Sequence, residues 1–180
     1  MSDRKYVLFG FLGPTIAIIF ISIAIVLSPW FSWGNNALSD LGHSVESDVA
    51  PLFNFGLLLS GFLIILYSIK SFRKHAKYTS YLLAFAGLSL QLVATFDEVY
   101  GWFHTNVSVL FFGALAFASI VYIVEKRSTV ATAALVLGLS SWIMYGLEIY
   151  SSGIAVPETI SAVAVVSWVL LSAYKIYFNK

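Results

Sequence analysis

The charged residues of this chain change sign from one gap between its apolar stretches to the next. Six apolar stretches can be marked, at residues 6–29, 51–69, 79–97, 105–124, 129–149 and 157–176. Each is close to the roughly 20 residues that a bilayer-spanning helix needs. All Lys and Arg residues fall at the chain ends or in alternate gaps: Arg4, Lys5, Lys70, Arg73, Lys74, Lys77, Lys126, Arg127, Lys175 and Lys180.

Cytoplasmic loops of membrane proteins are enriched in Lys and Arg. The pattern therefore predicts an all-α integral membrane protein, a bundle of six transmembrane helices with both termini in the cytoplasm. The predicted spans and their short links fill the 180 residues, so we expect one domain over 1–180. The first apolar stretch is longer than the 7–15 residues or so of a cleaved signal peptide, which indicates an uncleaved first helix.

Composition agrees with a membrane protein and excludes several kinds of site. Hydrophobic residues make up 59% of the chain, charged residues 11%, and the mean hydropathy is +0.88. The chain has no Cys, which excludes disulfides, thiolate metal ligands and thiol catalysis. No stripe of basic residues interleaved with aromatics suggests nucleic-acid binding. The Lys and Arg residues are better explained as topology determinants that contact anionic membrane lipids.

The opposite, outer side is acidic and has no basic residue to neutralise it. The acids there are Asp40, Glu46, Asp48, Asp97, Glu98, Glu148 and Glu158. Ionisable groups at membrane depth cost about 2.5–3.5 kcal/mol on insertion scales, so they are usually paired, hydrated or functional. The sequence therefore predicts an outward-facing polar pocket. The expected ligand-binding residues are Ser39, Asp40, His43, Asn54, Asp97, Glu98, His104 and Glu148.

Three acids of this side also have structural explanations. Glu46 and Asp48 fit solvated loop residues in the long polar link 30–50, where a short surface helix is expected to start near Ser39. Glu158 lies in the first turn of the sixth predicted helix, where a carboxylate complements the helix dipole. Glu148 comes late in the fifth predicted helix, where the dipole does not favour it, so it is the better candidate for a site.

A metal site is the alternative interpretation of the same cluster. Asp40 and His43 are three residues apart, which would place both on one helical face. Asp97 and His104 flank a short turn and are expected to meet across it. Two His and two Asp suit zinc or another divalent ion, whose bound water would hydrolyse a lipid with Glu98 or Glu148 as the base. No strong zinc motif such as H-E-x-x-H is present.

Two groups of short motifs resemble a known family. The first runs from Asn36-Ala37-Leu38-Ser39-Asp40-Leu41-Gly42 to Pro51-Leu52-Phe53-Asn54-Phe55-Gly56, and the second joins Gly101-Trp102-Phe103-His104 to Phe111-Phe112-Gly113. They resemble the prokaryotic membrane proteins grouped as domain of unknown function 998, and more distantly the eukaryotic DRAM and Sfk membrane proteins. The family pattern carries Pro after the Phe that here precedes His104. The resemblance implies six helices and a non-cytoplasmic motif at Ser39, Asp40, Gly42, Asn54 and His104, but no established reaction.

The sequence thus favours a membrane protein in the cell membrane of a prokaryote, whose outer pocket binds a lipid headgroup, a small cation or a small polar ligand. The first alternative is a metal-dependent membrane hydrolase acting on lipids, with Asp40, His43, Asp97 and His104 as zinc ligands. A small transporter is a further alternative, which the lack of an internal repeat disfavours. A structural membrane partner protein is the last.

Overall fold

The computed structural model describes residues 4–149 and 153–178, and these residues form helices and turns without a strand. They comprise six long helices and three short 3₁₀ helices, which lie between the first four long ones. In chain order these are α1 (Arg4–Leu27), η1 (Leu38–Gly42), α2 (Ala50–Lys70), η2 (Phe72–Lys74), α3 (Lys77–Thr95), η3 (Glu98–Tyr100), α4 (Trp102–Lys126), α5 (Thr129–Gly146) and α6 (Ala155–Phe178). All six long helices have the length and apolar character to cross a membrane. The predicted all-α, six-helix membrane fold is confirmed.

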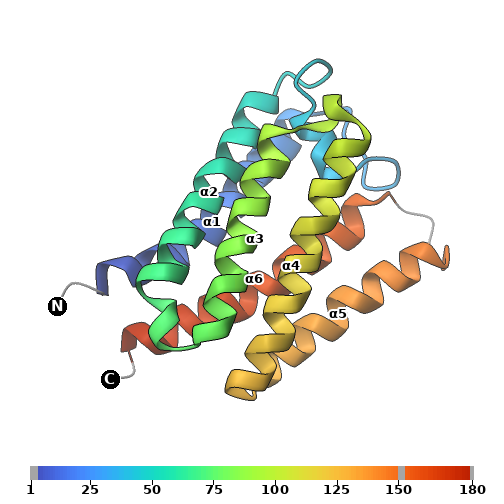
Figure 1. Ribbon diagram of the computed structural model, residues 1–180. Coiled ribbons are helices and arrows are strands. Elements are labelled where there is room, and N and C mark those ends of the chain that lie inside the picture. The colour runs from blue at the N-terminus through green and yellow to red at the C-terminus, as the bar shows by residue number, and fades with distance from the viewer. Residues whose placement is uncertain (1–3, 150–152, 179–180) are drawn as a thin grey trace.

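The long helices form a bundle from which α5 stands out. In Figure 1, α1, α2, α3 and α4 lie side by side and α6 crosses behind them. The fifth helix packs mainly against α6, and it meets α4 where the two are joined. From that junction α5 diverges from α4 along their length (Figure 1). The bundle core therefore comes mostly from the other five long helices, and α5 adds Ala131 and Ala134 to it from an outer layer.

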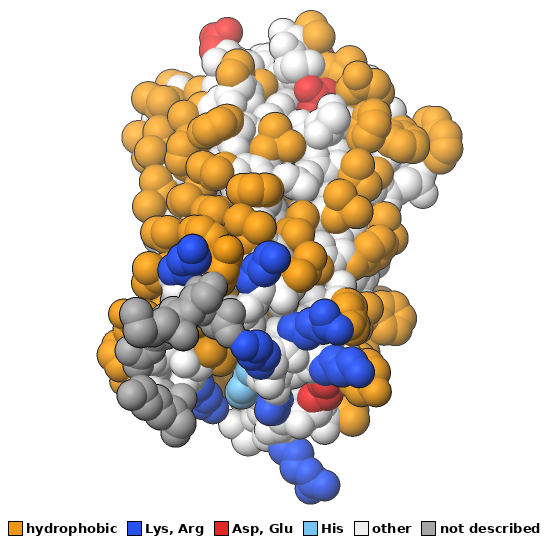
Figure 2. All heavy atoms as spheres, turned by 60° about the vertical axis from the view of Figure 1, so that its left-hand side comes forward, with side chains coloured by type: hydrophobic (Ala, Val, Ile, Leu, Met, Phe, Trp, Pro, Cys, Tyr) orange, Lys and Arg blue, Asp and Glu red, His pale blue; other side chains and the backbone are white. Residues whose placement is uncertain are grey.

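The two ends of the bundle differ in charge. Figure 2 shows Lys and Arg side chains gathered at one end, beyond a broad apolar surface. We name this the basic end, formed by Lys70, Arg73, Lys74, Lys77, Lys126, Arg127 and Lys175. Both chain termini lie at the same end (Figure 1). The opposite end, with η1 and η3, is named the acidic end. The orientation of the basic end toward the cytoplasm stays a prediction. Lys180, which was expected on the same side, lies outside the described residues.

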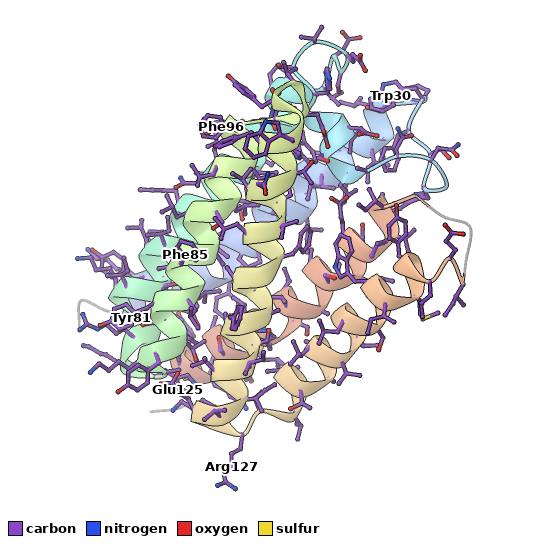
Figure 3. The ribbon with its side chains drawn as sticks, turned by 45° about the vertical axis from the view of Figure 1, so that its right-hand side comes forward. Trp30, Tyr81, Phe85, Phe96, Glu125 and Arg127 are labelled. Carbon is purple, nitrogen blue, oxygen red and sulfur yellow. The ribbon has the colours of Figure 1, made fainter. Side chains whose placement is uncertain are left out.

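One acid at the basic end has a structural reason to be there. The Glu125 carboxylate accepts hydrogen bonds from the backbone N–H groups of Tyr78, at 3.0 Å, and Thr79, at 2.9 Å. These N–H groups belong to the first turn of α3 and have no acceptor within that helix. Glu125 therefore caps α3 from the end of α4, and Figure 3 shows it at the same end of the bundle as Arg127.

The long link between α1 and α2 folds back into the bundle. The short helix expected near Ser39 does form, but its expected place on the surface was wrong. This helix, η1, has Leu41 fully buried and Leu38 8% exposed. Asn54 Nδ2 donates to the Gly42 carbonyl at 2.8 Å. A Cβ on Gly42 would lie 2.6 Å from Asn54 Oδ1, so this position has no room for a larger residue. Burial of two leucines explains why a polar link forms a lid over the acidic end.

A layer of aromatic side chains closes the bundle at the basic end. Tyr67, Phe72, Tyr122 and Trp168 are all buried and pack against one another, with the Tyr122 and Trp168 rings stacked at 4.7 Å. Their polar atoms are satisfied, since Tyr67 Oη bonds to Ser172 at 2.9 Å and Trp168 Nε1 donates to Ser119 at 3.2 Å. The layer separates the interior of the bundle from the basic end.

Acidification is expected to destabilise the basic end through His75, which lies between η2 and α3 outside the spans. Burial, followed by repulsion from Lys126 and Lys175, lowers the pKa of His75 to about 4. In the unfolded chain the pKa of this histidine is about 6.5. The unfolded chain therefore takes up a proton at a higher pH than the folded protein does. The free energy of unfolding is unaffected by His75 above about pH 6.5 and falls as the pH drops toward 4. Because the ring is partly exposed, we expect a loss of only about 1 kcal/mol.

Thermal unfolding in detergent between pH 7 and pH 4 measures this effect. A His75→Phe variant has no titrating ring, so its unfolding temperature should decline less than that of the wild type over the same range. Equal declines would show that other groups govern acid stability.

Candidate functional site: a capped apolar cavity

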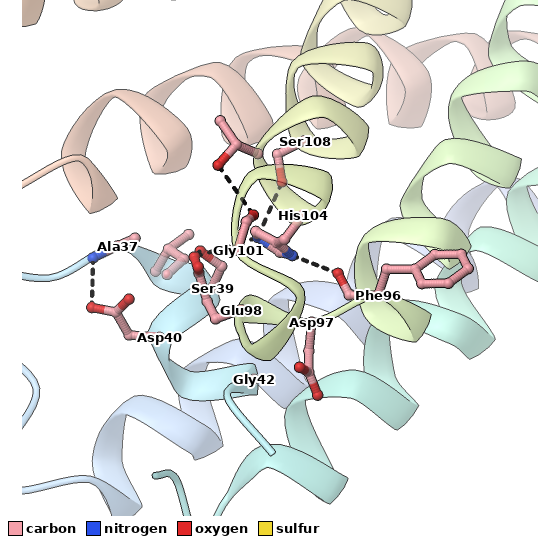
Figure 4. Close-up of polar contacts among 12 residues, drawn as sticks. Ala37, Ser39, Asp40, Gly42, Phe96, Asp97, Glu98, Gly101, His104 and Ser108 are labelled. Atoms are coloured by element: carbon pink, nitrogen blue, oxygen red, sulfur yellow. Dashed lines mark hydrogen bonds and ion pairs between the residues drawn. The ribbon is translucent and has the colours of Figure 1, made fainter. Parts of the chain in front are cut away.

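A hydrogen-bonded network joins three elements at the acidic end. Ser39 of η1 donates its hydroxyl to Glu98 Oε1 of η3 at 2.5 Å. The same carboxylate oxygen lies 3.4 Å from His104 Nε2, in the first turn of α4. Ser108, one turn further along α4, has its hydroxyl 3.2 Å from that nitrogen. Figure 4 shows these side chains turned toward one another. The network brings together Ser39, Glu98 and His104 from the predicted set.

His104 is the buried centre of the network, at 3% exposure. Its Nδ1 lies 2.7 Å from the Phe96 carbonyl, which can only accept, so Nδ1 carries a proton. Nε2 is then shared between Ser108 and Glu98. A neutral ring accepts from the Ser108 hydroxyl, whereas a protonated ring donates to the Glu98 carboxylate.

Glu158, which the sequence analysis assigned to the helix dipole, has a second role. It lies in the first turn of α6, is 9% exposed, and its Oε2 accepts the Leu38 N–H of η1 at 2.7 Å. This bond ties the lid to a helix 120 residues away in the sequence. Its other carboxylate oxygen has no hydrogen bond among the described residues. No local sequence pattern pointed to this role, because the bond joins residues far apart in the chain.

An apolar cavity of about 130 Å³ lies inside the bundle beneath this network. Five long helices line it, namely α1, α2, α3, α4 and α6, mostly with apolar side chains such as Leu57, Leu83, Phe111 and Val165. Its polar lining residues at the acidic end are Ser39, Ser108 and Glu158. Toward the basic end the aromatic layer follows. We name this space the central cavity; it is closed at one end and has acidic and hydroxyl groups at the other.

Other predicted site residues serve their own loops. The Asp40 carboxylate accepts from Asn36 Nδ2 at 2.7 Å and from the Ala37 N–H at 3.0 Å, as Figure 4 shows in part. His43 Nδ1 accepts the Glu46 N–H at 3.1 Å. These bonds shape the turns on either side of η1. The buried carboxylate of Asp97 accepts the Val99 N–H at 3.0 Å and so caps η3.

The predicted zinc ligands do not converge. Within residues 4–149 and 153–178, no three His, Asp or Glu side chains are placed to hold a metal ion together. Asp97 and His104 were expected to meet across their turn, but Glu98 makes that contact instead. The Asp97 carboxylate instead accepts the Val99 N–H, and Figure 4 shows it pointing away from His104. The geometry therefore gives the zinc interpretation no support.

Glu148 lies apart from the network, contrary to its place among the candidate residues. The helix α5 ends at Gly146, three residues earlier than the predicted 149. Glu148 follows in an exposed turn with a positive φ of 53°, a conformation uncommon for a residue with a side chain. Its carboxylate makes no hydrogen bond within the described part of the chain. We therefore remove Glu148 from the site.

Comparison with known proteins places the chain in a family without giving it an activity. A family model described as a protein of unknown function, DUF998, matches residues 11–175. The chain belongs to this family. The match covers α2, α3, α4 and α5 in full, most of α1 and α6, and both motif groups on which the resemblance rested. Searches of curated proteins and of solved structures found no match. The function of this DUF998 member must therefore be argued from its geometry.

Proposed function

We propose that this membrane protein binds an amphipathic ligand of the lipid class, with one apolar chain in the central cavity and the polar group under the η1 lid. The observation that carries the proposal is an apolar cavity of about 130 Å³ whose only charged lining residue, Glu158, lies at the acidic end with Ser39 and Ser108; one further hydroxyl, that of Ser60, lies midway along α2. An engineered apolar cavity of roughly 150 Å³ in a soluble protein stays dry and binds benzene, so this space suits part of a hydrocarbon chain.

The polar end defines the chemistry of the ligand's head. Free acceptors there include the second carboxylate oxygen of Glu158 and the hydroxyl oxygen of Ser108. No described Lys or Arg side chain lies at the acidic end, where a phosphate would find no charged partner. A head with amine or hydroxyl donors next to the chain fits these groups. If the positive-inside prediction holds, this head is bound on the outer side of the cell membrane.

Binding explains the structure better than transport does. A transporter needs a polar path to both sides of the membrane, whereas the buried aromatic layer of Tyr67, Phe72, Tyr122 and Trp168 closes the basic end. The metal-dependent hydrolase finds no support in the placement of Asp40, His43 and Asp97, as described above. A cavity that is closed at the basic end favours a ligand that is held rather than one that passes through.

Native mass spectrometry of the protein, purified in mild detergent, tests the proposal. We expect a lipid to stay bound to the wild type. An Ala162→Leu variant adds bulk to the lining of the central cavity and should lower the retained fraction about tenfold, which equals roughly 1.4 kcal/mol. The matched control is Ala133→Leu, on the exposed face of α5, which should retain lipid as the wild type does.

Two results would overturn the proposal. One is the absence of retained lipid in the wild type; the other is equal retention in Ala162→Leu. Because Ala162→Leu adds volume to a packed bundle, its thermal unfolding must be compared with that of Ala133→Leu. Leu90→Phe, from the α3 wall of the same cavity, is the second variant if Ala162→Leu does not fold.

A further inference from the structure

A second cavity, of about 420 Å³, lies between α4, α5 and α6. We name it the lateral cavity. Its lining and that of the central cavity have five residues in common: Ser108, Phe112, Leu115, Glu158 and Val165. The two spaces are therefore neighbours, separated only by these side chains. Glu158 and Ser108, which belong to the polar end of the proposed binding site, face both.

The lateral cavity lies on the side of the bundle that faces lipid. Val109 of α4 and Leu139 of α5 line it and are 67% and 49% exposed. The ribbon shows why, since α5 diverges from α4 toward the acidic end and leaves their facing surfaces apart (Figures 1 and 3). All three helices that form the cavity are membrane spans, so the medium at its mouth is the acyl region of the bilayer.

A buried polar group inside the lateral cavity has no partner. Ser161 is 8% exposed, lines this cavity, and its hydroxyl makes no hydrogen bond to the rest of the described chain. A buried hydroxyl without a partner is costly, particularly away from water. The Ser161 hydroxyl and the free oxygen of Glu158, one helical turn away, can form hydrogen bonds with the polar part of a ligand. The chain of that ligand would fill the apolar part of the lateral cavity.

Phe112 forms the partition between the two cavities. Its ring lies 5.3 Å from the ring of Trp142 on α5 and 5.1 Å from the ring of Phe111, which lines the central cavity. Phe112 is only partly buried, and beside it Gly113 contributes no side chain to the lateral cavity. Rotation of one aromatic ring would therefore join the two spaces.

We propose that the lateral cavity is the entrance through which a membrane lipid inserts its chain sideways from the bilayer into the central cavity. This inference rests on the proposed function, because it supplies the route to that binding site. The lipid passes between α4 and α5, its polar group moves past Ser161 to Glu158, and Phe112 is the barrier. The route spares the head a passage through the η1 lid.

Lipid exchange tests this route. The protein is loaded in nanodiscs with a monoacylglycerol, whose head has hydroxyl donors and whose chain is deuterated. It is then mixed with an excess of vesicles that contain the unlabelled monoacylglycerol, and the bound lipid is followed by native mass spectrometry. Gly113→Leu fills the lateral cavity, and its added Cβ would meet nothing within 4 Å, so folding should be preserved. We expect exchange about tenfold slower in Gly113→Leu and about threefold faster in Phe112→Ala. Retention at equilibrium should be unchanged in Gly113→Leu.

The matched control is Gly146→Leu at the end of α5, where an added Cβ also meets nothing within 4 Å and no cavity is lined. Its exchange rate should equal that of the wild type. Bound lipid with the same exchange rate in wild type, Gly113→Leu and Phe112→Ala would overturn the lateral entrance and leave the binding site standing. Absence of bound lipid in the wild type would overturn the proposed function, and the entrance with it.

Discussion

Replacing Gly61 with Ala is expected to destabilise the protein by about 3 kcal/mol, near the upper end of the usual cost of overpacking. At this point α2 and α3 cross with their backbones almost in contact. A Cβ on Gly61 would lie 2.5 Å from the Gly87 carbonyl oxygen, and one on Gly87 would lie 2.9 Å from the Gly61 carbonyl oxygen. Because backbone atoms cannot rotate aside, the two helices would have to separate. Membrane helices use small residues for this kind of approach.

Unfolding of purified protein in mixed micelles with increasing denaturing detergent measures the effect. The matched control is Gly113→Ala, another helical Gly→Ala change, whose Cβ would meet nothing within 4 Å. We expect this control to be as stable as the wild type, or up to about 1 kcal/mol more stable, since Ala is the better helix former. Equal free energies of unfolding for Gly61→Ala and Gly113→Ala would show that the α2–α3 approach is looser than described.

Removing the Glu158 side chain is expected to loosen the lid and to empty the cavity. In Glu158→Ala the buried N–H of Leu38 loses its acceptor, which costs about 1–3 kcal/mol. We expect hydrogen exchange across η1 to accelerate and the retained lipid to fall at least about tenfold. The ligand loses both a closed lid and an acceptor for its polar group.

A conservative variant separates these two contributions. Glu158→Gln keeps a carbonyl acceptor for the Leu38 N–H but removes the charge, so η1 should exchange at the wild-type rate while lipid retention falls in part. Glu46→Ala, which removes an exposed carboxylate of the same link, should change neither measurement. Unchanged protection of η1 in Glu158→Ala would contradict the role of the Leu38 bond.

Hydropathy and charge alone predicted the spans to within a few residues, because both follow local rules. An apolar run of about 20 residues must cross the bilayer as a helix, since its backbone groups have no other partners there. The grouping of Lys and Arg by alternate gaps reappears as the basic end in Figure 2. The fifth helix was predicted too long because apolar residues such as Leu147 and Ile149 continue the pattern beyond its end at Gly146.

The fold of the 30–50 link could not be read from local sequence. Its polar composition predicted a surface helix, but Leu38 and Leu41 are enough to bury η1. The bond between the Leu38 N–H and Glu158 joins residues 120 positions apart, and no local pattern encodes such a pairing. The central and lateral cavities depend on the angles at which helices cross, which hydropathy does not specify.

The candidate site was predicted as a region but not as a set of contacts. An acidic side without bases pointed to one end of the bundle, and Ser39, Glu98 and His104 meet there. Which carboxylate would approach His104 depended on the conformation of one turn. Asp97 caps η3, an ordinary role for Asp at the start of a turn, and this leaves Glu98 to face the histidine.

Photocrosslinking tests the central claim most directly, because it locates the bound chain. The protein is equilibrated in nanodiscs with a monoacylglycerol that has a diazirine within its acyl chain, irradiated, and the modified residues are identified by peptide mass spectrometry. We predict adducts on residues that line the central cavity, such as Leu57, Phe111 and Val165. Adducts confined to lipid-facing residues such as Val26 and Val124, with none on the cavity lining, would contradict a lipid chain held inside the bundle.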